Sequence, residues 1–204
     1  MSSTTPDAAE PTRPGSAPGG SRAGPKAGPD AGPTLDDAIA LATRVHTGQI
    51  DKGGEEYIGH PLRVMATVAR TAEAAGVDPH TAQLAAVLHD VVEDSDTTLA
   101  DLTAAGYPAP VVAAVDALSH RPDEPMQDYL ARVAADPLAV VVKRADMQDN
   151  SDPVRLGRLA PEQADRLATR YAGRRELLDD LVSARNIRSA RNIRSASDVG
   201  PGRR

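Results

Sequence analysis

The stretch LAAVLHDVVEDSDTT, residues 84–98, contributes most to the fold assignment. Its apolar residues recur three or four positions apart from Leu84 to Val91, and they are interrupted by an adjacent imidazole and carboxylate, His89 and Asp90. Apolar residues at this spacing indicate the buried face of a helix. A histidine–aspartate pair at the end of such a face indicates a polar site built into a helical core.

Helix signals recur on both sides of this stretch. Thr34 can cap a helix together with Asp37, Asp78 precedes a proline suited to a first helical turn, and Thr98 can cap a short helix. Further helices are expected over 61–76, 110–120, 126–135, 137–150 and from Glu162 to about Ser183. The valine-rich 138–143 segment favours a strand in isolation, but without partner strands we interpret it as buried helix. The sequence predicts an all-α bundle of roughly seven or eight helices.

Composition narrows the class of protein. The 204 residues include 2% aromatic residues, with no Phe and no Trp, so Leu, Val, Ile and Ala must form the core. The absence of cysteine excludes disulfides, thiolate zinc sites and a cysteine nucleophile. No apolar run approaches the roughly 20 residues of a membrane span, and the N-terminus lacks the apolar stretch of a signal peptide. We expect a cytoplasmic protein without membrane association.

Three regions differ in composition. Residues 1–33 are rich in Pro, Gly and Ala and are expected to be a disordered leader, and residues 34–182 are expected to form the domain. Residues 183–204 form an Arg-rich tail with SARNIR twice in tandem, expected to be a frayed helix end. The leader is neutral and the tail carries +5, so a net charge of −6 leaves −11 on the domain. Such a domain is a poor binder of nucleic acid, which leaves only the tail for RNA.

Two more residues extend the polar site. His60 lies in YIGHPLRV and Asp146 in VVVKRADMQDN, each beside an apolar segment. With the His89–Asp90 pair they supply two imidazoles and two carboxylates, enough for one divalent metal. Taken singly, His60 could be a helix cap. A buried Asp146 needs a partner, and Asn150 one turn later lies on its face better than Lys143 or Arg144 does.

Acidic residues cluster just after the His89–Asp90 pair. On a continued helix Glu93 would share a face with His89, and Asp94 with Asp90. Alone, these acids would be interpreted as a solvated helix end. Next to a buried histidine they are costly without a cation between them, so the cluster favours a functional site.

The segments HPLRV, VLHD, VVEDSDTT and KRADMQDN together resemble the hydrolase domain of the RelA/SpoT family and its small stand-alone relatives, within the HD metal-dependent phosphohydrolase superfamily. The similarity covers roughly residues 35–156. It implies an HD-domain helical bundle holding one Mn²⁺, and the ligand types also suit Fe²⁺ or Zn²⁺. The implied roles are metal ligands at His60, His89, Asp90 and Asp146, water activation by Glu93 and Asp94, and substrate contact by Asn150.

The loop DKGGEEYIGH, residues 51–60, differs from the family at one position. Lys52 matches, but Asp51 occupies the position of an arginine that packs on the guanine base in the family. His46 lies near this loop, either to contact phosphate or as a helix-end residue.

The activity implied by the resemblance is removal of the 3′-pyrophosphate from guanosine tetra- or pentaphosphate, a small nucleotide, giving GDP or GTP and pyrophosphate. Alternatives are hydrolysis of another phosphorylated nucleotide or small phosphate ester, a non-catalytic nucleotide sensor, and an RNA-associated protein acting through the Arg repeat.

Overall fold

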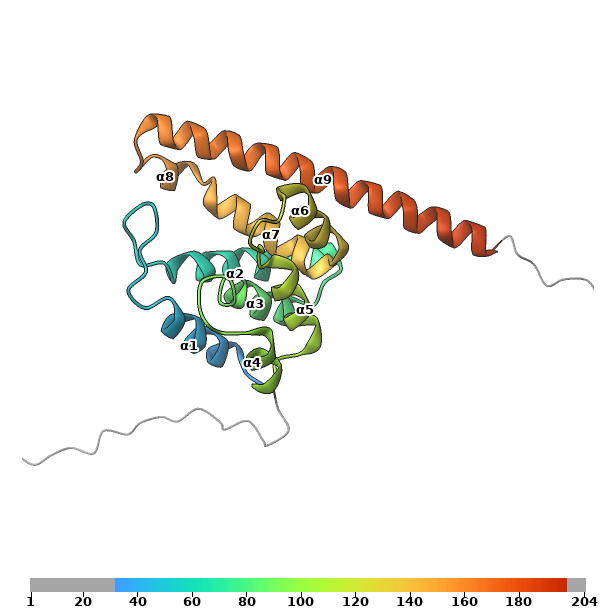
Figure 1. Ribbon diagram of the computed structural model, residues 1–204, viewed down its shortest axis with the longest axis horizontal. Helices are drawn as coiled ribbons and strands as arrows, with labels where there is room; N and C mark the ends of the chain where they lie inside the picture. The colour runs from blue at the N-terminus through green and yellow to red at the C-terminus, as the bar shows by residue number, and fades with distance from the viewer. Residues whose placement is uncertain (1–31, 198–204) are drawn as a thin grey trace, which may run out of the picture. The chain divides into compact units, whose positions relative to one another are not determined.

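A computed structural model describes residues 32–197 of the chain, with side chains described up to residue 192. Within that part the regular structure is helical, and the β-type pairing consists of one isolated bridge between Ile50 and Glu56 (Figure 1). The helices are α1 (Leu35–Val45), α2 (Gly59–Thr71), the 3₁₀ turn η1 (Glu73–Ala75), α3 (Pro79–Leu88), α4 (Leu99–Ala104), α5 (Ala109–Leu118), α6 (Met126–Ala135), α7 (Pro137–Asn150), α8 (Pro153–Leu156) and α9 (Pro161–Ser197). The predicted all-α class is confirmed, and the valine-rich segment is helical.

The predicted caps form. Thr34 and Thr98 each make a reciprocal capping box with the aspartate three residues later. The Asp78 side chain accepts the amide of Thr81 at the start of α3. Each cap satisfies amide groups that the first turn of a helix leaves without partners. These local signals therefore place the beginnings of α1, α3 and α4.

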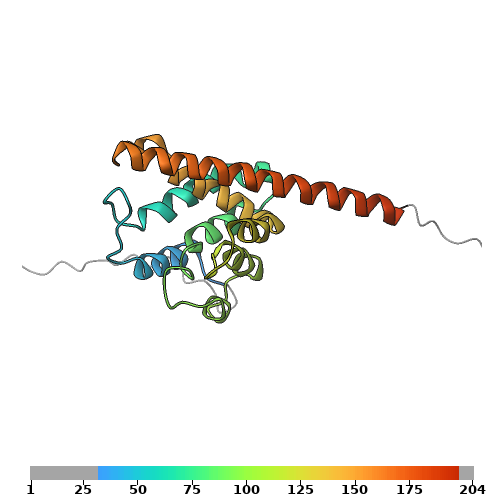
Figure 2. The ribbon, with the colours of Figure 1, turned by 45° about the horizontal axis from the view of Figure 1, so that its top comes forward.

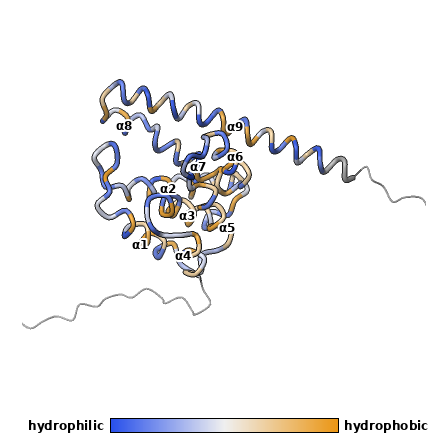
Figure 3. Tube along the Cα trace, in the orientation of Figure 1, coloured by the Kyte–Doolittle hydropathy of each residue, from blue (hydrophilic) through white to orange (hydrophobic). Residues whose placement is uncertain are grey.

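Helix α3 lies in the middle of the bundle, where it packs against α1, α2, α5 and α7 (Figure 1). Its residues Leu84 and Leu88 are at most 1% exposed, and Val64 of α2 is fully buried. Apolar segments gather along these central helices, whereas polar residues dominate the outer helix α9 (Figure 3). Because α3 is covered on most sides, the residue that follows its last turn, His89, is carried into the interior.

Two expectations about the site segments were wrong in detail. The helix containing His89 does not continue to Asp94, because α3 ends at Leu88 and turns follow it. The amide of Val91 bonds the carbonyl of Leu88, three residues back, which tightens the backbone out of α-helical geometry. His60 is also not a helix cap, since α2 begins one residue earlier, at Gly59.

Helix α9 is longer than expected. It continues from Pro161 to Ser197 instead of ending near Ser183, and its C-terminal half extends past the other helices in both views (Figures 1 and 2). The SARNIR copies contain neither Gly nor Pro, so nothing in them breaks a helix. Within the described part, no helix combines the length and apolarity that crossing a membrane requires. The predicted leader lies outside the described residues, except for Gly32 and Pro33.

Candidate metal centre

Three helices bring together the histidines and the distant aspartate. His60 comes from the first turn of α2, His89 from the end of α3 and Asp146 from α7, and each is at most 4% exposed. His60 Nε2 lies 3.2 Å from Asp146 Oδ1, and His89 Nε2 lies 3.9 Å from the same oxygen. One potential ligand atom from each of the three lies within 4.8 Å of the others, which is an arrangement that could hold a metal ion.

Each of the two histidine rings is oriented by a contact through its Nδ1 atom, which leaves Nε2 facing the centre. His89 Nδ1 lies 2.8 Å from the carbonyl oxygen of Ala86, which can only accept, so Nδ1 carries the hydrogen. His89 Nε2 is then buried and makes no hydrogen bond of acceptable geometry, although a carboxylate oxygen of Asp90 lies 2.9 Å away. His60 Nδ1 is 2.7 Å from Asp149 Oδ2. A histidine that binds a metal through one nitrogen usually donates the other N–H to a carbonyl or a carboxylate, so both rings fit a divalent metal.

Asp90 borders the same space. Its Oδ2 atom lies 2.9 Å from His89 Nε2 and 3.8 Å from His60 Nε2. The phenol of Tyr57 donates a 2.6 Å hydrogen bond to this oxygen. Burial and the charge of Asp90 raise the pKa of Tyr57, so the phenol keeps its hydrogen. Asp90 therefore borders both imidazoles, while the group whose ligand atoms all lie within 4.8 Å of one another consists of His60, His89 and Asp146.

Asp146 has two partners on its own helix. Asn150 Nδ2 donates to Asp146 Oδ1 at 2.5 Å, as the one-turn spacing predicted. Lys143 Nζ also lies 2.8 Å from Asp146 Oδ2, so discounting Lys143 as a partner was wrong. Lys143 is less well aligned with Asp146 around the helix axis than Asn150 is, but its side chain is long enough to reach the aspartate three residues later. Burial opposes ionisation of Asp146, but Lys143, His60 and His89 together outweigh it and hold the pKa of this aspartate well below its usual value.

The electrostatics of the centre favour a cation. Burial alone would lower the pKa of His60, but the hydrogen bonds of Asp146 and Asp149, together with the charges of Asp146 and Asp90, outweigh it and raise the pKa to about 9. The pKa of His89 is also raised, because the interaction with Asp90 and the charge of Asp146 together outweigh burial. Without a metal the site therefore binds protons on its imidazoles, which is the behaviour expected where carboxylates surround ligand nitrogens.

The two acids predicted to activate water lie next to the centre in different settings. Glu93 is exposed, and its Oε2 accepts a 2.8 Å hydrogen bond from the backbone amide of His120. Burial and the charges of Asp90 and Glu93 raise the pKa of Asp94. A carboxylate with a raised pKa is a better proton acceptor near neutral pH than an ordinary one.

The predicted substrate residues lie in two places. Lys52 and Asn150 line one cavity together with Arg155 and Tyr171. His46 is instead the C-cap residue directly after α1, 2% exposed, with Nδ1 2.8 Å from Gln49 Oε1. Its helix-end position agrees with one of the two interpretations, and phosphate contact by His46 stays a prediction.

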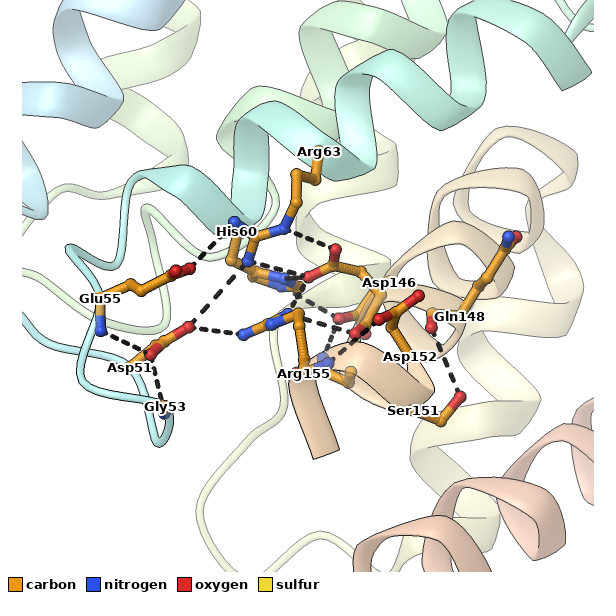
Figure 4. A network of polar contacts seen from close by, with 12 residues as sticks. Asp51, Gly53, Glu55, His60, Arg63, Asp146, Gln148, Ser151, Asp152 and Arg155 are labelled. Atoms are coloured by element: carbon orange, nitrogen blue, oxygen red, sulfur yellow. Dashed lines mark hydrogen bonds and ion pairs between the residues drawn. The ribbon is translucent and has the colours of Figure 1, made fainter. Parts of the chain in front are cut away.

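A group of residues behind His60 was missed from the sequence. The Asp149 carboxylate contacts His60 Nδ1, accepts a hydrogen bond from Arg63 Nε at 2.7 Å and accepts another from the Arg155 guanidinium. Arg155 also donates to Asp51 Oδ2 at 2.6 Å (Figure 4). The signal for Arg63 was its spacing, one helical turn after His60. Arg155 and Asp51 are 104 residues apart, so no local pattern connects them.

Parts of the sequence are similar to those of known proteins. The HD domain family model matches residues 57–151. A guanosine-3′,5′-bis(diphosphate) 3′-pyrophosphohydrolase of Vibrio cholerae is 33% identical over 145 residues, which are 66% of this chain and 19% of that protein. A GTP pyrophosphokinase of Streptomyces coelicolor is 32% identical over 130 residues, 59% of this chain and 15% of that protein. The chain thus spans less than a fifth of either relative.

A solved structure has a similar fold. It belongs to a metazoan ortholog of SpoT that hydrolyses ppGpp, is 21% identical, and aligns with a TM-score of 0.53 over 74% of this chain and 94% of that one. At this identity the likeness supports the helical fold. The sequence matches, the fold and the grouped histidines and aspartates agree with one another: residues 57–151 match the HD domain family and are similar to a named 3′-pyrophosphohydrolase.

Proposed function

We propose that the chain is a metal-dependent phosphohydrolase that releases pyrophosphate from guanosine-3′,5′-bis(diphosphate). The observation that carries the proposal is the buried His89 Nε2, which makes no hydrogen bond of acceptable geometry and faces two carboxylate oxygens, Asp90 Oδ2 at 2.9 Å and Asp146 Oδ1 at 3.9 Å. A buried nitrogen lone pair is costly unless something binds it, and a divalent cation meets that need. Sequence similarity to a named 3′-pyrophosphohydrolase supports the choice of substrate.

The proposed metal is Mn²⁺, with Fe²⁺ and Zn²⁺ as alternatives, held by His60, His89, Asp90 and Asp146. Mixed imidazole and carboxylate ligands suit these ions better than Mg²⁺. When bound, such an ion supplies Lewis acidity and lowers the pKa of water. Tyr57 and Lys143 each occupy one oxygen of a ligand carboxylate, which fixes the orientation of Asp90 and Asp146.

The residues around the centre have the properties needed for hydrolysis. Asp94, with Glu93 beside it, takes a proton from the attacking water as the water adds to the phosphorus attached to the 3′ oxygen. The bond between this phosphorus and the 3′ oxygen breaks, and the 3′ oxygen takes up a proton to become a hydroxyl group. Lys52 and Asn150 are proposed to contact the nucleotide, and their presence in the lining of one cavity supports this.

The test is pyrophosphate release from guanosine tetraphosphate by the full chain, with Mn²⁺ and with chelator. Metal-dependent formation of GDP and pyrophosphate that is absent from a folded Asp90→Ala variant is the expected result. No release by folded, metal-loaded protein would overturn the substrate assignment. Release from other phosphorylated nucleotides would then favour the broader hydrolase alternative, and nucleotide binding without turnover would favour a sensor.

A further inference from the structure

Arg155 lies between two carboxylates that are far apart in the sequence. It comes from α8, and its guanidinium bonds Asp51 Oδ2 at 2.6 Å on one side and the Asp149 carboxylate on the other (Figure 4). It also donates to the backbone carbonyl of Asp149 at 3.2 Å. A planar guanidinium can bond two carboxylates at once in a fixed geometry, which a lysine ammonium does less well. The side chain therefore joins the segment before α2 to the end of α7.

On the Asp149 side the connection leads to a predicted metal ligand. Asp149 Oδ2 lies 2.7 Å from His60 Nδ1, and Arg63 Nε holds Asp149 Oδ1 at 2.7 Å. The Asp149 side chain is only 10% exposed, so its charge depends on these partners. Its position sets the direction of the His60 ring, because the hydrogen bond is made through Nδ1.

On the Asp51 side the connection leads to the turn at residues 51–55, which we call the substrate loop. Asp51 Oδ1 accepts the amide of Gly53 at 2.8 Å and that of Glu55 at 3.0 Å, and its side chain is 6% exposed. One carboxylate thus shapes the loop with one oxygen and holds Arg155 with the other. Lys52, which lines the cavity beside Arg155, lies inside this loop.

We propose that Arg155 is a positioning residue that couples the substrate loop to the metal centre through the chain Asp51–Arg155–Asp149–His60. The function assigned to the loop rests on the proposed hydrolase, but the link to the metal does not. Metal binding that fixes His60 should order Asp149, Arg155 and the loop in turn. By reciprocity, whatever orders the loop strengthens metal binding.

A comparison of two arginines tests this. Arg158 follows three residues later, pairs with Glu55 of the same loop and lines the same cavity, but it makes no described contact with Asp149. Arg155→Gln should weaken Mn²⁺ binding about tenfold, the lower end of the range for residues that orient metal ligands. Arg158→Gln should change it less than about twofold. Isothermal titration of the full chain with Mn²⁺ alone measures both.

Loop order gives a second readout that needs neither substrate nor turnover. Hydrogen exchange of the peptide containing residues 51–55 should slow when Mn²⁺ is added to the natural protein and to Arg158→Gln, but not to Arg155→Gln. Arg155→Lys should restore part of the coupling. If Arg155→Gln fails to fold, Asp51→Asn replaces it, since the amide oxygen can still accept the Gly53 and Glu55 amides while the charge facing Arg155 is lost.

Equal Mn²⁺ affinities for Arg155→Gln and Arg158→Gln, or loop protection that survives in Arg155→Gln, would overturn the proposal. If Asp51→Asn were used instead, a Mn²⁺ affinity equal to that of the natural protein would overturn the proposal in the same way. Absence of guanosine tetraphosphate hydrolysis would count against the proposed function while leaving this coupling intact.

Discussion

Asp149 Oδ2 lies 2.7 Å from Nδ1 of His60, on the opposite side of the ring from Asp146. The ring thus lies between two carboxylates: Asp149 orients the ring, and Asp146 is proposed to bind the same metal. Because Arg63 pairs with Asp149, the orienting carboxylate stays ionised, and its hydrogen bond with His60 lowers its pKa further. This relationship makes Asp149 part of the metal site although it touches no metal position itself.

Asp149→Ala should therefore weaken Mn²⁺ binding about 10- to 100-fold, since the orientation of the His60 ring is lost. The natural protein and the variant are compared by calorimetric titration at one pH. Asp179→Ala is the control, because Asp179 pairs with Arg144 on an exposed surface, where such pairs contribute little. Unchanged affinity in Asp149→Ala would show that the neighbouring helices orient the ring without it.

The metal-free protein should lose stability as the pH rises through about 9. The pKa of His60 is raised from 6.5 to about 9 in the folded chain, so the folded state binds this proton more tightly than the unfolded state does. The resulting stability is complete below the unfolded value of 6.5 and is lost progressively as the pH rises through 9. The shift corresponds to about 3 kcal/mol.

Urea unfolding of chelator-treated protein at several pH values measures this dependence. His60→Gln removes the titrating group and should flatten the curve between neutral pH and 9. A natural protein whose unfolding free energy stays level over that range would contradict the raised pKa of His60. Added Mn²⁺ should reverse the trend, because metal and proton compete for the same nitrogen.

Helix positions were predictable where the signals are local. A threonine with an aspartate three residues later, or an aspartate before a proline, satisfies helix amides within one turn, so Thr34, Asp78 and Thr98 could be identified directly. The end of α3 could not be identified in this way. The residues after Leu88 continue an apolar spacing, and the bonds that mark the turn, from the Val91 amide to the Leu88 carbonyl and from the His89 ring to the Ala86 carbonyl, are seen only in the structure.

The candidate site divides in the same way. His60, His89, Asp90 and Asp146 were found because each stands out as a polar residue beside an apolar run. Lys143 was discounted on its backbone position alone. That position says little about where the end of a side chain as long as lysine lies. Asp51 was noted only as a departure from the family's arginine, whereas the fold pairs it with Arg155. Such a pairing between distant segments requires the tertiary structure.

The aliphatic core should be sensitive to truncation at Leu88. This residue is fully buried where α3 ends, immediately before His89. Leu88→Ala should lower the free energy of unfolding by about 2–5 kcal/mol, because the lost contacts leave a cavity that the close-packed helices fill only partly. Ile187→Ala is the control, since Ile187 on α9 is 55% exposed. Thermal and urea unfolding measure both, and equal losses would show that α3 does not organise the core.

Asp94 and Glu93 should differ from the metal ligands in how their loss affects the protein. Asp94→Asn keeps the size of the side chain and removes the proton acceptor, so kcat for pyrophosphate release should fall about 10²- to 10⁴-fold while Mn²⁺ affinity changes little. Asp146→Asn should instead lose both, because it alters a ligand. Glu93→Gln should cost less activity than Asp94→Asn, since one Glu93 oxygen accepts the His120 amide, whereas burial and the neighbouring charges raise the pKa of Asp94. If Asp94→Asn lost metal binding and activity together, Asp94 would be a metal ligand and not a base. If that variant kept full activity, the proton-accepting role would belong to Glu93.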